Sequence, residues 1–214
     1  MSRTLKTDMP GPDRRVGVAE AREKGWRAVF APDVAEPLPL VVELGFGRGE
    51  FLRALAAAAP AVAHVGVDRS HRRSLKLARR IAKTEERNVR LVEGTAEELV
   101  TGALDDGSVA TFWVNFPDPW PKKRHHRRRL LQPGFVALLA QRLVPGGLLH
   151  AATDHAGYAA QIDTVLAAEP GLVNALAAPF VAEVPGRPCT AYEAMWRAEG
   201  RALHFFTYRR RGEP

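Results

Sequence analysis

Hydrophobic residues along this chain gather into short runs, and longer stretches of helical length separate those runs. Predominantly apolar runs of the kind that form buried strands occur at 38–47, 63–70, 88–94, 108–117 and 148–154. The intervening stretches predict helices at 50–59, 71–86, 133–147 and 156–169. A final run at 202–211 predicts one more strand, which we expect at an edge of the sheet.

Strands and helices alternate along the chain, and this order predicts an α/β fold with a doubly wound, mostly parallel sheet and helices on both faces. The helix at 133–147 is expected to end at the glycine pair that closes that stretch, as helix C-caps often do. Ligands of doubly wound folds bind beyond the carboxyl ends of the strands. We therefore expect the functional residues at those ends.

The chain divides into an N-terminal arm at 1–37, punctuated by prolines and expected to be partly mobile, and a single domain at 38–214. Within the arm, Trp26 and Phe30 are expected to dock on the core of that domain. Because 46% of the residues are hydrophobic, the chain can bury one core of substantial size.

Positive charge is concentrated in one segment. The formal net charge is +7, and the segment from Pro119 to Thr153 holds seven Lys and Arg residues but no Asp or Glu. A local basic block of this kind indicates a polyanionic partner, and we favour nucleic acid. A solvated surface and a patch for anionic lipid are the alternatives.

Cysteine usage and hydropathy narrow the function classes further. The single cysteine, Cys189, rules out an intrachain disulfide, which fits a reducing compartment, and its surroundings offer no spacing typical of a metal site. No apolar run reaches the roughly 18 residues of a membrane span, and residues 1–30 lack the apolar segment of a signal peptide. We therefore expect a cytoplasmic protein with no metal.

A glycine-rich loop follows the strand at 38–47. Gly45, Gly47 and Gly49 precede the next helix, and Asp68 closes the second strand. Glycines let the backbone approach a ligand closely, and a carboxylate at the end of the second strand can accept both ribose hydroxyls of a nucleoside. The order of strand, glycines, helix and acid therefore predicts a nucleoside-containing ligand.

The loop departs from the G-x-G-x-x-G pattern of dinucleotide sites, because its sixth position is Glu50. A carboxylate at the start of the helix would repel a pyrophosphate, and Glu43 adds another acid two residues before the first glycine. A cationic ligand suits these acids better, and S-adenosylmethionine carries an adenosine, an ammonium and a sulfonium but no phosphate. We favour that ligand; a nicotinamide or flavin cofactor, and a tight turn without a ligand, stay open.

The stretch NFPDPWPKKRHHRRRL, at 115–130, resembles the signature block of the bacterial tRNA (guanine-N7-)-methyltransferases. The pattern of that family is a Phe-Pro-Asp-Pro-Trp turn followed by a lysine, an Arg-His pair and a basic run. The glycine loop ELGFGRGEF, the ATD at 152–154 and the TAYE at 190–193 are also similar to those of the family. The resemblance covers roughly residues 38–210.

The resemblance implies a Rossmann-like class I methyltransferase fold, S-adenosyl-L-methionine as methyl donor and a variable-loop guanosine of tRNA as substrate. It implies that Asp118 is the catalytic acid and also lies at the cofactor. The other cofactor-binding residues that it implies are Glu43, Gly45, Gly47, Asp68 and Thr95. The substrate-binding residues that it implies are Lys122, Asp154, Thr190, Ala191, Tyr192 and Glu193.

Two features depart from the pattern of that family. Where the family tends to carry an Asp near the adenine, this chain has Gly94 and Thr95, so the contact falls to the threonine hydroxyl or to the backbone. The N-terminal arm is short of the family's arginine-rich pattern, and the sequence does not assign it a role.

The chemistry of guanine N7 suits an aspartate that orients the base and stabilises charge. N7 has a free lone pair at neutral pH, so its attack on a sulfonium methyl needs no general base. Positioning of the two reactants is worth up to about 7–11 kcal/mol, and a carboxylate stabilises the positive charge that develops on the ring. Pro117 and Pro119 fix φ on both sides of Asp118. Trp120 either stacks on the base or packs the turn.

The lysines and arginines at 122–129, Arg129 among them, are expected to contact tRNA phosphates. Glu193 is expected to accept from the N–H groups of guanine or from a lysine, and a purely structural ion pair is the alternative. The sequence does not distinguish a monomer from a homodimer.

Two other functions stay open. An amino-methylating enzyme acting on adenine or glutamine would carry an Asn/Asp-Pro-Pro-aromatic turn after the fourth strand, whereas this chain has Asn115-Phe116-Pro117-Asp118. A Rossmann-like module that binds RNA without catalysis would bind tRNA but not the methyl donor.

Overall fold

The computed structural model describes residues 6–84 and 86–212, and a seven-stranded sheet forms its centre in the order β3-β2-β1-β4-β5-β7-β6. The strands are β1 (Leu40–Leu44), β2 (His64–Asp68), β3 (Val89–Glu93), β4 (Val109–Asn115), β5 (Leu143–Thr153), β6 (Leu172–Asn174) and β7 (His204–Arg210). β1 to β5 are parallel, and β7 is antiparallel to both of its neighbours. The predicted doubly wound, mostly parallel α/β fold is therefore confirmed.

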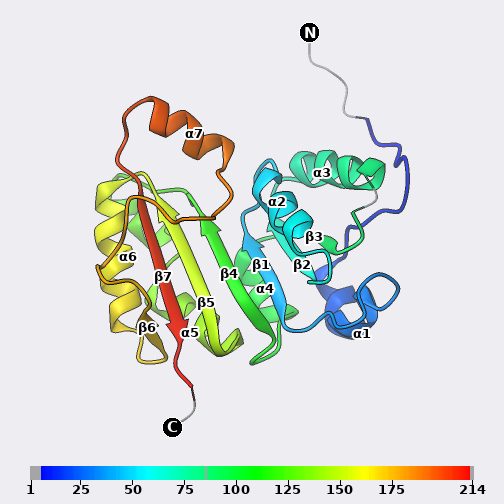
Figure 1. Cartoon of the computed structure of the whole chain (residues 1–214), viewed down its shortest axis with the longest axis horizontal. Helices are drawn as coiled ribbons and strands as arrows, with labels where there is room; N and C mark the ends of the chain where they lie inside the picture. Colours follow the sequence, from blue (N-terminus) through cyan, green and yellow to red (C-terminus); the bar gives the residue numbers. More distant parts are fainter. Residues whose placement is uncertain (1–5, 85, 213–214) are drawn as a thin grey trace.

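Helices cover both faces of the sheet (Figure 1). On one face, α2 (Glu50–Ala58) and α3 (His71–Thr84) pack against β2 and β3. On the other, a continuous layer consists of α1 (Val18–Phe30), α4 (Ala96–Gly102), α5 (Pro133–Arg142) and α6 (Ala156–Ala168). The last helix, α7 (Ala191–Ala198), stands above the carboxyl ends of β4 and β5 (Figure 1).

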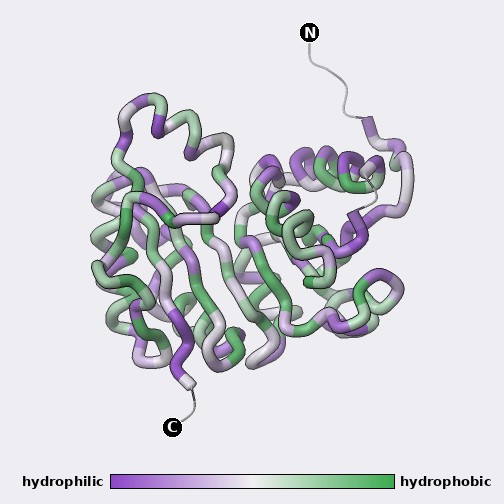
Figure 2. The backbone as a smooth tube through the Cα atoms, in the orientation of Figure 1, coloured by the Kyte–Doolittle hydropathy of each residue, from purple (hydrophilic) through white to green (hydrophobic). Residues whose placement is uncertain are grey.

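The core lies where these layers meet, and the hydrophobic residues in Figure 2 follow the strands and the inner sides of the helices. Trp26 and Phe30 of α1 are buried as expected, and the Trp26 indole N–H donates to the Ala103 carbonyl at 2.6 Å. The expected mobile start of the arm falls partly on residues 1–5, which lie outside the described residues. The division of the chain at residue 37 stays a prediction.

The helix expected to reach the glycine pair ends earlier. α5 stops at Arg142, and β5 begins at the next residue. Gly146 has a φ of 78°, and a Cβ on Gly147 would lie 2.9 Å from the Val144 carbonyl oxygen. The two glycines therefore allow a tight bend and a close backbone approach at the start of β5, and they do not cap a helix.

The expectation that the last strand is an edge strand is also wrong. β7 lies between β5 and β6, so the three-residue β6 forms the edge. The run at 202–211 has the arginine-rich end typical of an edge, but its residues Phe205, Phe206 and Tyr208 are buried. The sequence analysis also missed β6 and the helices α1, α4 and α7, most of which are too short to show a clear period.

Candidate active site

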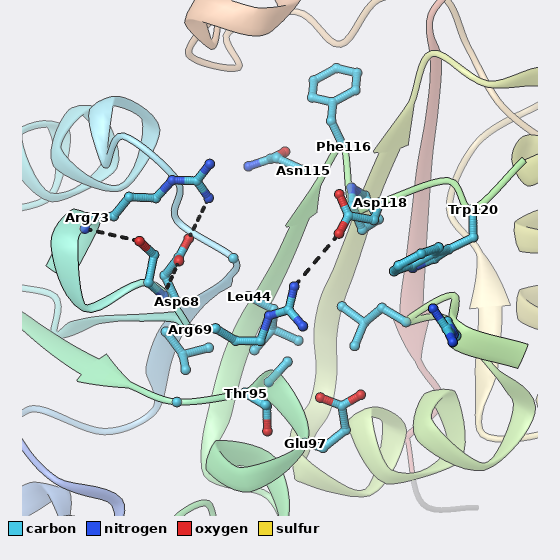
Figure 3. A pocket seen from close by; sticks show the side chains of 18 residues that line it. Leu44, Asp68, Arg69, Arg73, Thr95, Glu97, Asn115, Phe116, Asp118 and Trp120 are labelled. Carbon is cyan, nitrogen blue, oxygen red and sulfur yellow. Dashed lines mark hydrogen bonds and ion pairs between the residues drawn. The ribbon is translucent and has the colours of Figure 1, made fainter. Parts of the chain in front are cut away.

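Two adjoining clefts open at the carboxyl ends of the parallel strands. The large cleft, of about 900 Å³, is lined by the ends of β1, β2 and β4 and by the start of α4 (Figure 3). The small cleft, of about 440 Å³, lies between the glycine loop and α7. The residues that border both clefts are Gly45, Arg73, Asn115, Phe116, Pro117 and Asp118.

The glycine loop fixes the carboxylate of Asp68, which lines the large cleft. The Gly47 N–H donates to Oδ2 at 2.9 Å, and the Ser70 N–H donates to Oδ1 at 2.8 Å. Gly47 and Gly49 both have positive φ, and a Cβ on Gly49 would lie 2.3 Å from a methyl carbon of Leu77. Because each carboxylate oxygen has two lone pairs, Asp68 keeps acceptor capacity for a ligand. The structure thus brings together the loop and the acid that the sequence singled out.

Glu43 is buried in β1 at the edge of the small cleft. The Asn115 Nδ2 donates to its Oε1 at 3.0 Å, whereas its Oε2 has no hydrogen-bond partner among the described residues. Burial raises the pKa of Glu43 to about 7, although the hydrogen bond from Asn115, the charge of Arg187 and the backbone N–H of Leu52 act in the opposite direction. A buried carboxylate oxygen without a partner is a favourable place for a cationic ligand group.

Thr95 lines the large cleft, but its hydroxyl is engaged at the start of α4. Thr95 Oγ1 accepts from the Glu98 N–H at 3.1 Å, and the Thr95 N–H donates to Glu98 Oε2 at 2.7 Å, which together form a capping box. The hydroxyl also donates to Glu98 Oε2, at 3.0 Å. Glu97 borders the same cleft and carries a carboxylate there (Figure 3). The sequence analysis missed Glu97, although an acid was sought after the third strand and Glu97 is the first one past Gly94 and Thr95.

The turn after β4 holds two large residues in a strained backbone conformation. Phe116 has a φ of 50° and Trp120 a φ of 43°, a region that costs side chains of this size about 1–3 kcal/mol each. The Phe116 ring packs on the Trp196 ring of α7 at 4.8 Å, and the Arg128 guanidinium lies 5.1 Å from the centre of the Trp120 ring. These contacts hold the turn in place on both sides of its aspartate.

Asp118 projects from this turn into the large cleft (Figure 3), and it also borders the small cleft. Its side chain is 70% exposed, and its carboxylate lies 3.9 Å from the guanidinium of Arg69 at the end of β2. Pro117 and Pro119 flank it, so the backbone on both sides has little freedom. The same turn brings Trp120 to the wall of the large cleft, where it packs against Arg128 and remains available to a ligand.

Residues from β5 and α7 form the outer wall of the small cleft. Asp154, at the end of β5, pairs with Arg201 at 3.0 Å. Thr190 caps α7 by accepting the Glu193 backbone N–H at 3.0 Å, and the exposed ring of Tyr192 stacks on Trp196 with centroids 5.5 Å apart. The small cleft therefore has an aromatic wall beside an acid.

Two of the expected substrate residues, Glu193 and Lys122, do not line the small cleft. Glu193 is buried, and its carboxylate accepts hydrogen bonds from Arg187 and from Arg197, the latter at 3.1 Å. This is the structural ion pair that the sequence left open. Lys122 is exposed next to the 3₁₀ helix η1 (Lys123–Arg128) and borders neither cleft. Ala191 is the first residue of α7.

The basic block is exposed except at its last residue. The exposed members are Lys122, Lys123, Arg124, Arg127 and Arg128. Arg129, which we expected at tRNA phosphates, is buried and donates to the Pro119 carbonyl at 2.7 Å, the Gly157 carbonyl at 3.1 Å and the Gln161 side chain at 2.8 Å. That expectation is wrong, because Arg129 ties the aspartate turn to α6 and has no free face for RNA.

Asn115 and Arg187 are two further residues that the sequence analysis did not assign to the site. Asn115 ends β4, so the rule that places ligands at strand ends was sufficient to find it. Arg187 comes from the segment before α7, and no local pattern marks it.

Within residues 6–84 and 86–212, no three His, Cys, Asp or Glu side chains are grouped closely enough to hold a metal ion. Across the same part of the chain, no helix combines the length and the apolar character that crossing a membrane demands.

Comparisons with known proteins show the family to which this chain belongs. Residues 37–206 match the model of a family described as a putative methyltransferase. A tRNA (guanine-N(7)-)-methyltransferase of Thiobacillus denitrificans is 39% identical over 92% of each chain. This chain belongs to the tRNA (guanine-N(7)-)-methyltransferase family. Another member, from Alkalilimnicola ehrlichii, is 40% identical and is matched over 92% of this chain and 89% of its own.

Solved structures of other methyltransferases share the fold of this family member. The 16S rRNA methyltransferase KamB has a TM-score of 0.63 at 18% identity, with 86% of this chain and 93% of that chain covered. The antibiotic-resistance methyltransferase Kmr has a TM-score of 0.58 at 19% identity, with 88% and 94% covered. Such low identities show the fold alone, and that fold is the Rossmann-like class I methyltransferase fold implied by the signature block.

Proposed function

We propose that this protein transfers the methyl group of S-adenosyl-L-methionine to N7 of a variable-loop guanosine in tRNA. The observation that carries the proposal is the position of Asp118, which borders both clefts. A nucleoside-type ligand in the large cleft and a base in the small cleft would meet beside this one carboxylate. The turn that presents it is the part of the chain most similar to the family's signature.

The residues around the glycine loop fit S-adenosyl-L-methionine, the methyl donor. The positions that a Cβ would take on Gly45 and Gly47 have no atom within 4 Å, so a ligand can lie against the backbone there. Asp68 has the remaining acceptor capacity for ribose hydroxyls, and the unpaired Oε2 of Glu43 suits the ammonium. We place the adenine beside Gly94, Thr95 and Glu97, where the contact falls to the carboxylate of Glu97 because Glu98 engages both the hydroxyl and the backbone N–H of Thr95. When bound, the methyl donor supplies an electrophilic methyl on a sulfonium.

The small cleft fits an extruded purine base. Tyr192 and Trp196 offer aromatic surface on which an unstacked base can lie, as in other RNA-binding proteins. We assign Asp154, Thr190, Ala191 and Tyr192 to substrate binding and give Glu193 the role of holding α7. Lys122 belongs with the exposed basic residues that contact phosphates.

Asp118 acts on this base as an orienting and charge-stabilising group. The N7 lone pair forms a bond to the methyl carbon while the carbon–sulfur bond breaks, and no proton moves. The positive charge passes from sulfur to the purine ring, where an adjacent carboxylate lowers the energy of the transition state. Because Asp118 is stiffly held between two prolines, little reorganisation accompanies the step.

The exposed basic block lies directly beyond Asp118 in the chain and borders the large cleft through Arg128. It supplies sequence-independent attraction for the tRNA backbone, while the small cleft selects the base. A cytoplasmic location fits a tRNA substrate.

The test measures transfer of labelled methyl from S-adenosylmethionine to three transcripts of one tRNA. The first has guanosine at the variable-loop position, the second has adenosine, and the third has 7-deazaguanosine, which lacks only the N7 nitrogen. We expect labelling of the first transcript alone. Undiminished labelling of the 7-deazaguanosine transcript would refute N7 as the acceptor, and labelling of the adenosine transcript would refute the assignment of the position.

A further inference from the structure

An arginine with a buried side chain lies beneath α7, outside the residues assigned to either ligand. Arg187 belongs to the segment that crosses β7 and β5 before α7 (Figure 1), and its side chain is only 4% exposed. Its guanidinium carbon lies 4.8 Å from the ring centre of Phe51 in α2, 5.9 Å from that of Trp113 in β4 and 4.9 Å from that of Phe205 in β7. Three elements of the domain therefore fix the position of this charge.

Arg187 connects the two sides of the active site through hydrogen bonds. On one side it donates to the Glu193 carboxylate in α7. On the other, its Nη2 donates to Asn115 Oδ1 at 2.6 Å, and Asn115 Nδ2 donates to Glu43 Oε1 at 3.0 Å. An unbroken series of polar contacts thus joins the helix beside the small cleft to the carboxylate that we assign to the methyl donor.

The order of donors in this series matters. A guanidinium has donors and no acceptor, so it can bond only to the oxygen of the Asn115 amide. That contact turns the amide NH₂ toward Glu43, where it favours the ionised carboxylate. Without Arg187, the amide could rotate by half a turn and present its oxygen to Glu43, an arrangement that favours the protonated acid.

We propose that Arg187 is a positioning residue, which holds Asn115 in the orientation that presents an amide N–H to Glu43 and ties α7 to the same carboxylate. It touches neither ligand, and it acts on methyl-donor affinity through Asn115 and Glu43. The inference rests on the proposed function only in taking Glu43 as the acid that receives the ammonium of the methyl donor.

The electrostatics of Glu43 agree with this role. Burial raises its pKa to about 7, and both the Asn115 hydrogen bond and the Arg187 charge hold the pKa below the value that burial alone would give. The charged groups that act on Glu43 are Arg187 before α7 and Asp68 in β2. The other charged residues that line the same cleft are Arg48, Glu50, Arg73, Asp118, Asp154 and Arg201. Asp68 acts against ionisation of Glu43, so the loss of Arg187 leaves Glu43 more often protonated near neutral pH.

The experiment measures binding of S-adenosylhomocysteine, which keeps the ammonium but has no methyl to transfer, by calorimetry from pH 6 to pH 8.5. The wild type should bind more tightly as pH rises through about 7. In Arg187→Met the pH at which the affinity rises should be higher by about one unit. Binding should then be about five- to tenfold weaker than in the wild type at pH 6–7, but within about twofold of it at pH 8.5. Arg187→Lys, which keeps the charge and a donor, should restore most of the wild-type profile.

A matched control separates this effect from a loss of packing. Arg90 is also buried, lies 4.6 Å from the centre of the Phe30 ring and pairs with Asp33 at 2.7 Å, but it borders neither cleft. Arg90→Met should lower stability and leave the pH profile of binding unchanged. If Arg187→Met does not fold, as judged by circular dichroism, Asn115→Leu carries the test, because it removes the same donor to Glu43.

Weakening of equal size at every pH, or an unchanged profile, would overturn the inference and make Arg187 a packing residue only. Methyl transfer to tRNA is measured with the same protein preparations. This second measurement distinguishes a failure of the inference about Arg187 from a failure of the proposed function. An unshifted profile in a protein that methylates tRNA refutes the role of Arg187 alone. A shifted profile in a protein that does not methylate any tRNA transcript refutes the proposed function alone.

Discussion

The buried carboxylate of Glu43 gives the ligand-free protein a stability that depends on pH. Its pKa is raised from an ordinary 4.5 to about 7, so between these values the folded state holds a proton that the unfolded chain releases. Stability is therefore greatest at low pH in this window and falls as pH rises through about 7. The shift corresponds to about 3 kcal/mol in full, of which about 2–3 kcal/mol falls between pH 5 and pH 8.

The change that exposes this contribution is Glu43→Gln, which removes the ionisation but keeps the shape. We expect the unfolding free energy of the wild type, measured by urea denaturation without ligand, to fall between pH 5 and pH 8 by about 2–3 kcal/mol more than that of the variant. If the glutamine lowers the unfolding free energy by the same amount at every pH, that amount cancels when the two pH dependences are subtracted. The half-exposed carboxylate of Glu50 is the control, and Glu50→Gln should follow the pH dependence of the wild type.

Parallel pH dependences of the wild type and Glu43→Gln would refute the reasoning. They would mean that Glu43 ionises in the folded protein as it does in the unfolded chain, which is incompatible with a desolvated carboxylate whose second oxygen has no partner. The unpaired oxygen would then be no reason to place a cationic group there.

Three further predictions concern Asp118 and the basic block that follows it. Asp118→Ala should keep methyl-donor and tRNA affinity within about tenfold in binding assays while single-turnover transfer falls about a hundredfold or more, and an equal loss of binding would make Asp118 a recognition residue. Changing Arg127 and Arg128 together to Gln should reduce the slope of log K against log salt for tRNA binding by about 1.5, whereas an unchanged slope would move the RNA footprint elsewhere. Arg129→Gln should leave that slope unchanged and lower the unfolding free energy, by about 1–3 kcal/mol for each buried carbonyl left without a donor.

Much of the site could be predicted from the sequence because its parts are local. The glycine loop, Asp68 and the Asp118 turn each follow directly on a strand whose apolar run is plain, and parallel strands bring their carboxyl ends to one edge of the sheet. Once the strands are recognised, the residues that follow them must lie near one another. For the same reason, the sequence was sufficient to predict that Asn115, the last residue of β4, lies at the site.

Only the tertiary structure decided how buried each charge is and which partner it has. Arg128 and Arg129 are adjacent in one basic run, yet the first is exposed and the second is enclosed by carbonyl groups of other elements. Likewise, no sequence pattern pairs Glu193 with Arg187, yet the two side chains meet, and aromatic rings of α2, β4 and β7 surround the arginine. Hydrophobic periodicity reports which face of an element is buried, but the desolvation and pairing of a charge depend on contacts between segments far apart in the chain.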